Sequence, residues 1–250
     1  MANEVKLPKT DRVQRSGNSR PVPVHARIRG WLSTPEREQS RGEEIANSIS
    51  HGVALIAALA GIPFLIIHAA THGDTGFMVG VYLFSATITI LYLSSTLYHA
   101  LPMGTAKRLF RVIEHCAIFL LIAGSYAPFA LGVLRGAWGW TLLGMVWCLA
   151  LAGVAVEVFG KRTHPLFSTG LYLLMGWLAV IAIDPLFEKV PAPGLLWLFA
   201  GGLAYTGGVA FFLTDSRLRY GHLIWHLFVI AGTICHYFAV LWYAGYTPTN

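Results

Sequence analysis

Residues 77–101 read FMVGVYLFSATITILYLSSTLYHAL, a run of 25 residues that contains no Asp, Glu, Lys or Arg. An α-helix needs about 17–25 mostly apolar residues to cross a bilayer, so this run predicts a transmembrane helix. A transmembrane strand needs only about 9–11 residues and alternates in polarity, which this run does not. The stretch therefore favours a helical membrane protein.

The rest of the chain repeats this pattern. Hydrophobic residues make up 55% of the 250-residue chain and charged residues only 12%, about half the charged share of soluble proteins. So little charge cannot cover a water-facing surface, which excludes a soluble domain, a disordered chain and a nucleic-acid-binding domain. We predict an all-α integral membrane fold, a bundle of seven transmembrane helices over Ala46–Ala69, Phe77–Leu101, Phe110–Leu134, Trp138–Phe159, Pro165–Ile183, Gly194–Leu213 and His222–Ala244.

A hydrophilic segment precedes the first span. Residues 1–44 are rich in Arg, Pro, Ser and Glu and have no periodic apolar pattern, which predicts a largely disordered tail. They also lack the apolar stretch of a signal peptide. We therefore divide the chain into this tail and a transmembrane domain, residues 45–245.

The basic residues predict the orientation of the spans. Cytoplasmic loops of membrane proteins carry an excess of Lys and Arg. Sixteen basic residues lie in the tail and in the segments after the second, fourth and sixth spans, against two on the other side, Arg135 and Lys189. We expect the N-terminus in the cytoplasm and the C-terminus outside, opposite to G-protein-coupled receptors.

Polar residues gather at the predicted inner ends of four spans. Ionisable side chains inside a span are costly, so each marks a potential functional site. Four polar residues lie at the start of the first span, and two lie near one end of each of the second, third and seventh spans: Glu44, Asn47, Ser50, His51, Ser95, His99, Glu114, His115, His222 and His226.

Three of these histidines are suited to hold a metal ion. His222 and His226 are four residues apart, so both imidazoles leave the same face of one helix. His99 reaches the same depth from another span. Three imidazoles without a fourth protein ligand leave a position for water, as in catalytic zinc sites, although they do not select zinc alone. His68 and His72 share the spacing but have no third ligand nearby, and we interpret them as interfacial.

The neighbouring polar residues have two interpretations each. Glu114 either pairs with Arg111, one turn earlier, or faces inward as a general base beside a metal-bound water. Ser95 either bonds its own helix backbone or shares the inward face of His99. Four polar residues at the start of the first span form one stripe: Glu44, Asn47, Ser50 and His51. We favour this stripe as support for the metal ligands. It could also be an ordinary helix start, stabilised by the acidic Glu44.

Five other polar residues are expected to have no special role. Three of them are acidic residues at the ends of spans, Glu157, Asp184 and Asp215. The other two, His164 and His236, are interpreted as boundary or core histidines with satisfied hydrogen bonds.

Four motifs in this order resemble the hemolysin III family of bacterial membrane proteins. They are Glu44-x-x-Asn47-x-x-Ser50-His51-Gly52, SSTLYHAL with Ser95 and His99, EHCAIFLLIAGSYAPF from Glu114, and GHLIWHLFVIAG with His222 and His226. The family is related to the progestin and adipoQ receptors, which include the adiponectin receptors, and more distantly to alkaline ceramidases. The resemblance covers about residues 44–245.

The resemblance implies a multi-pass protein of the bacterial inner membrane with a zinc ion near the cytoplasmic face. The zinc ligands would be His99, His222 and His226. A family aspartate contacts the zinc-bound water, and Glu114 stands in its place here, which moves the carboxylate by one methylene. A ceramide-like lipid amide as substrate is likewise an implication of the resemblance.

Three functions are compatible with these observations. The first is a zinc-dependent membrane hydrolase, with Glu114 as general base and Ser95 hydrogen-bonded to the developing oxyanion or to the water. The second is a non-enzymatic receptor or regulator of membrane or energy state with structural zinc. The third, a pore-forming cytolysin, is least favoured because the outer halves of the spans have almost no polar residues. The expected partner is a membrane lipid, ceramide-like or a fatty acid, and not a nucleic acid.

Overall fold

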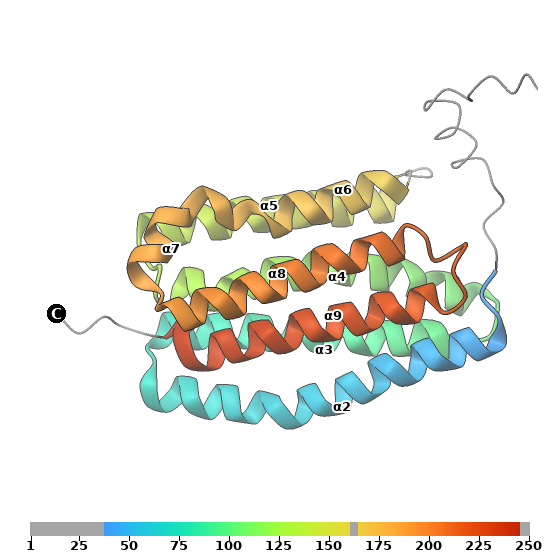
Figure 1. The fold of residues 1–250 in the computed structure, drawn as a ribbon, viewed down its shortest axis with the longest axis horizontal. Helices are drawn as coiled ribbons and strands as arrows, with labels where there is room; N and C mark the ends of the chain where they lie inside the picture. Colours follow the sequence, from blue (N-terminus) through green and yellow to red (C-terminus); the bar gives the residue numbers. More distant parts are fainter. Residues whose placement is uncertain (1–37, 161–164, 246–250) are drawn as a thin grey trace, which may run out of the picture. The chain divides into compact units, whose positions relative to one another are not determined.

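The computed structural model describes residues 38–160 and 165–245, and within them the protein is helical throughout (Figure 1). The elements are α2 Arg41–His72, α3 Thr75–Ala100, α4 Thr105–Leu131, α5 Ala137–Phe159, α6 Pro165–Gly176, η1 Leu178–Ala182, α7 Ile183–Lys189, α8 Ala192–Phe212, α9 Gly221–Ala239 and η2 Val240–Ala244. They form seven helical segments long and apolar enough to cross a membrane, which confirms the predicted seven-span fold.

The helices pack as neighbours with α3 and α4 at the centre. α3 lies between α2 and α4, α4 also packs on α5, and α9 packs on both α8 and α2. In the most apolar stretch of each helix, 50% of the residues are buried in α3 and 56% in α4. The corresponding share is only 17% in α2 and in α8. The outer helices expose large apolar side chains instead, such as Ile56, Phe64 and Leu196. Such a surface is suited to lipid and not to water.

α2 begins at Arg41, five residues before the predicted first span. Ser40 caps it: the Ser40 Oγ accepts the Glu43 N–H, and the Glu43 carboxylate accepts the Ser40 N–H at 2.9 Å. This reciprocal pair is a capping box, which fixes the start of a helix. Residues 41–44 of the predicted tail are therefore helical, and residues 1–37 of that tail lie outside the described part of the chain.

Glu43 also connects the start of α2 to the start of α9. Its Oε1 accepts the backbone N–H of Tyr220 at 2.8 Å, directly before α9 begins. Tyr220 has a φ of 59°, a left-handed conformation that is uncommon for a residue with a side chain. The buried Glu43 carboxylate thus holds the turn from which His222 and His226 follow.

The fifth span differs from the continuous helix predicted over Pro165–Ile183. α6 ends at Gly176, the five-residue 3₁₀ helix η1 follows, and α7 extends the helical region to Lys189. The Tyr126 hydroxyl of α4 donates to the Met175 carbonyl at 2.8 Å and accepts the Ala179 N–H at 3.0 Å. Backbone groups released by a break within a membrane need such partners. The apolar run alone does not reveal the break, because its partner lies on another helix.

Candidate metal site

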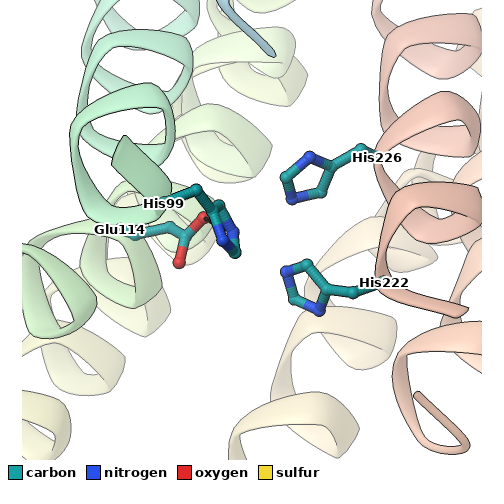
Figure 2. Close-up of side chains that lie close together, drawn as sticks. All are labelled: His99, Glu114, His222 and His226. Carbon is teal, nitrogen blue, oxygen red and sulfur yellow. Dashed lines mark ion pairs between the residues drawn. The ribbon is translucent and has the colours of Figure 1, made fainter. Parts of the chain in front are cut away.

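At one end of the bundle α2, α4 and α9 begin and α3 ends (Figure 1). Four side chains from three helices converge there. They are His99 of α3, Glu114 of α4, and His222 and His226 of α9. One ligand atom from each lies within 4.8 Å of the others. Figure 2 shows the two α9 histidines facing His99 and Glu114 across a shared space. The structure therefore brings together the residues that the sequence singled out for metal binding and base catalysis.

The helical spacing places the three imidazoles at similar separations. The rings of His222 and His226, one turn apart on α9, have centroids 4.7 Å apart. The His99 ring lies 5.0 Å from the first and 5.1 Å from the second. The three ring centroids thus form a near-regular triangle, and three imidazoles grouped in this way suit a single metal ion between them.

Two of these imidazoles are oriented by carboxylates. The Nδ1 of His99 lies 2.7 Å from Glu44 Oε2, and the Nδ1 of His222 lies 2.8 Å from Asp215 Oδ2. Glu44 is itself 3.0 Å from the ammonium of the buried Lys107. A carboxylate on Nδ1 fixes the ring so that its other nitrogen points away, which is the usual support for a metal-ligating histidine.

A serine orients the third imidazole. The Nδ1 of His226 lies 3.0 Å from Ser50 Oγ, which also bonds the carbonyl of Asn47 at 2.8 Å. Asn47 is fully buried; its side chain donates to Gln39, and its backbone bonds His226 as well as Ser50. The predicted polar stripe of α2 thus reaches the cluster at Glu44 and Ser50.

The second ring nitrogen of each of the three histidines, Nε2, is free to bind a ligand. The Nε2 atoms of His99, His222 and His226 are buried and have no hydrogen-bond partner among the described residues. The closest carboxylate contact is Glu114 Oε1, 3.8 Å from His99 Nε2, which is beyond hydrogen-bond distance. A buried nitrogen without a partner is unfavourable, and three that converge fit a metal ion that would satisfy them together.

Glu114 faces this cluster and not the outer surface of α4. Its side chain is buried and points to the shared space, whereas Arg111, one turn earlier, is exposed. The geometry thus agrees with the inward interpretation of Glu114. Its role as a base stays a prediction.

Ser95 and His51 form a separate pair beside the cluster. The Oγ of Ser95 lies 2.7 Å from His51 Nδ1, and the His51 ring stacks on His226 with centroids 3.6 Å apart. Ser95 is therefore on the inward face, as one interpretation of the sequence had it, but its contact is to an imidazole and not to the shared space.

Asp215 shows where the sequence interpretation was wrong. It was expected to have no role, yet it is the residue that orients His222. In the sequence, the only indication of this contact is that Asp215 lies seven residues before His222. The loop between α8 and α9 has to fold before the two side chains meet. Glu43 and Lys107 were also missed, because each acts through a residue distant in sequence.

The remaining histidines lie away from the cluster. His68 and His72 stack on each other at the far end of α2, apart from any metal-binding group among the described residues. His115 lies 3.7 Å from Glu157, whose other oxygen accepts a hydrogen bond from Ser168. His164 lies outside the described residues.

A cavity of about 530 Å³ extends from the cluster between α4, α6, α7, α8 and α9. Glu114 and His222 line one end of it, and most of the other lining residues are apolar. Its lining includes Phe187 of α7 and Leu196 and Phe199 of α8, whose side chains are more than half exposed. The cavity thus reaches from the polar cluster to the lipid-facing surface.

The comparisons with known proteins agree with this architecture. Residues 39–237 match the family model described as Haemolysin-III related. The chain is 43% identical to Hemolysin-3 of Bacillus cereus over 80% of its length and 91% of the relative's. It is 28% identical to the human Monocyte to macrophage differentiation factor, over 83% of this chain and 87% of the relative. The chain is 25% identical to the Adiponectin receptor protein of Drosophila melanogaster, over 57% of this chain and 36% of the relative. No solved structure matches. The chain belongs to the Haemolysin-III related family.

Proposed function

We propose that this member of the Haemolysin-III related family is a zinc-dependent membrane hydrolase that cleaves a ceramide-like lipid amide. The observation that carries the proposal is the convergence of three unpaired imidazole nitrogens beside Glu114, at the end of an apolar cavity. The excess of basic residues in the tail and in alternate loops supports a site near the cytoplasmic face of the cell membrane.

The residues present fit a zinc ion. His99, His222 and His226 would hold it, since their Nε2 atoms are free and their Nδ1 atoms are each held by an oxygen. When bound, zinc lowers the pKa of a water to about 7 and polarises the carbonyl that the water attacks.

Glu114 is placed to move the proton. Its carboxylate lies among the ligand atoms and also lines the cavity from which a substrate would approach. It would accept the proton of the attacking water and return it to the nitrogen of the leaving amine. Ser95, predicted as an oxyanion donor, would instead position His51, because its hydroxyl lies 2.7 Å from that imidazole.

The cavity supports a lipid substrate. Its volume of about 530 Å³ is within the range of roughly 300–1,000 Å³ typical of ligand sites. Its apolar lining and its extension to exposed side chains of α7 and α8 would let an acyl chain enter from the bilayer. The polar end, with Glu114 and His222, would receive the amide.

One observation favours a second function, a non-enzymatic receptor with structural zinc. A Glu114 oxygen lies within 4.8 Å of all three histidine ligand atoms, so Glu114 can serve as a fourth ligand. Four protein ligands close a zinc site and leave no position for water. The role of Glu114 therefore separates the two functions.

The test compares the wild-type protein with Glu114→Gln and Glu114→Asp, each loaded with zinc. For a hydrolase, Glu114→Gln keeps its zinc and thermal stability but loses hydrolysis of ceramide and simpler N-acyl amides by about 100-fold or more. Glu114→Asp is the matched control, because it keeps the carboxylate. Loss of zinc and stability in Glu114→Gln, with no turnover by the wild type, would support the receptor instead.

A further inference from the structure

A second polar group lies in the same cavity, away from the metal site. His236 of α9 and Tyr205 of α8 both line the cavity, and their rings meet edge to face with centroids 5.4 Å apart. His236 follows His226 by ten residues on the same helix, which places it about 15 Å further along the axis. It was expected to be a core histidine with satisfied hydrogen bonds.

The packing fixes the orientation of the His236 ring. A Cβ added to Gly201 of α8 would lie 2.3 Å from His236 Cδ2 and 2.6 Å from Nε2, so that edge of the ring lies directly against α8. The opposite atom, Nδ1, is buried and has no hydrogen-bond partner among the described residues. Packing therefore accounts for one edge of the ring and leaves the other edge without a partner.

The neighbouring Tyr205 hydroxyl has spare capacity as an acceptor. Thr233 Oγ1 donates its only proton to the Val229 carbonyl at 3.0 Å. The Tyr205 hydroxyl, 3.0 Å from the same Oγ1, must then be the donor of that pair. Its own oxygen remains able to accept a hydrogen bond. His236 bonds the backbone of Leu198 and its Nδ1 has no partner, so Nε2 carries the ring proton and Nδ1 is an acceptor. Nδ1 and the Tyr205 oxygen are thus both acceptors, and a hydroxyl group in the cavity can donate its proton to Nδ1.

We infer that His236 and Tyr205 form a second polar subsite that binds a hydroxyl group on the chain of the lipid in the cavity. The inference rests on the proposed function, since it assumes that an acyl chain occupies the cavity with its polar end at the metal cluster. It adds a preference to that function: lipids hydroxylated near the middle of the chain bind better than unsubstituted ones. Within hydrocarbon, the subsite makes this distinction because a plain methylene leaves Nδ1 unpaired.

The test measures the binding of stearic acid and 12-hydroxystearic acid to the purified full-length protein in nanodiscs. The wild type should bind the hydroxylated acid about fivefold more tightly, as one added neutral hydrogen bond gives. His236→Leu should bind both acids equally, with stearic acid within about twofold of the wild type. Ser125→Ala is the matched control, because Ser125 also lines the cavity but its hydroxyl already bonds the Ile122 carbonyl.

The outcomes separate this inference from the proposed function. Equal binding of the two acids by the wild type overturns the subsite, whether or not the variants fold. A preference that survives in both His236→Leu and Tyr205→Phe also overturns it. If the wild type binds neither acid, the lipid cavity of the proposed function fails and the subsite with it. If only the preference is missing, the proposed function stands without the subsite.

Discussion

The Nδ1 of His222 lies 2.8 Å from Oδ2 of Asp215, which precedes it in the loop between α8 and α9. This contact leaves the Nε2 of His222 as the nitrogen that faces His99 and His226. The candidate metal site is therefore built from a loop residue as well as from the helices that carry its histidines.

Asp215→Ala should weaken zinc binding about 10- to 100-fold, because the imidazole of His222 loses the partner that fixes its orientation. The measurement is a competitive titration of the zinc-loaded protein with a chelator. Asp184→Ala, an exposed acidic residue in the first turn of α7, is the control and should leave the affinity unchanged. Equal affinities in the wild type and Asp215→Ala would show that the contact has no role in metal binding.

Tyr126→Phe should destabilise the protein by about 1–2 kcal/mol, because it removes the hydroxyl that bonds Met175 and Ala179 at the break between α6 and η1. Thermal unfolding in a fixed detergent measures the change. Tyr82→Phe alters a half-exposed tyrosine on α3 and should have no such effect. If both variants unfold like the wild type, the break does not depend on this hydroxyl.

Gly80→Ala should destabilise the contact between α3 and α4 by about 1–3 kcal/mol. An added Cβ would lie 2.6 Å from both the Ala127 carbonyl oxygen and Pro128 Cα, which are backbone atoms that cannot turn aside. Gly144→Ala on α5 is the opposite case, since a Cβ there meets nothing within 4 Å, and it should be neutral or stabilising. The same unfolding assay compares the two, and an unchanged Gly80→Ala would contradict the close approach.

The sequence predicted those features that depend on composition and local spacing. Apolar runs gave all seven spans, and the four-residue spacing of His222 and His226 placed both on one face of α9. The start of α2 was missed although the spacing Ser40-x-x-Glu43 is the local pattern of a capping box. The break after Gly176 was missed because its partner, Tyr126, lies on another helix.

The four side chains that converge in the candidate site were predictable, but the residues that bond to them were predictable only in part. His99, Glu114, His222 and His226 stood out because polar residues inside spans are costly. Asp215, Glu43 and Lys107 lie at helix ends, where charge is ordinary, so only the fold shows that they hold the site. The direction of Ser95, toward His51, likewise depends on how α2 packs on α3.

Metal analysis of the purified protein after zinc loading and dialysis tests whether three histidines hold a zinc ion. The wild type and a His68→Ala/His72→Ala variant, which removes the other histidine pair of the same spacing, should each hold about one zinc ion per chain. The triple variant His99→Ala/His222→Ala/His226→Ala should hold none. Zinc retained by the triple variant, or absent from the wild type, would contradict the account.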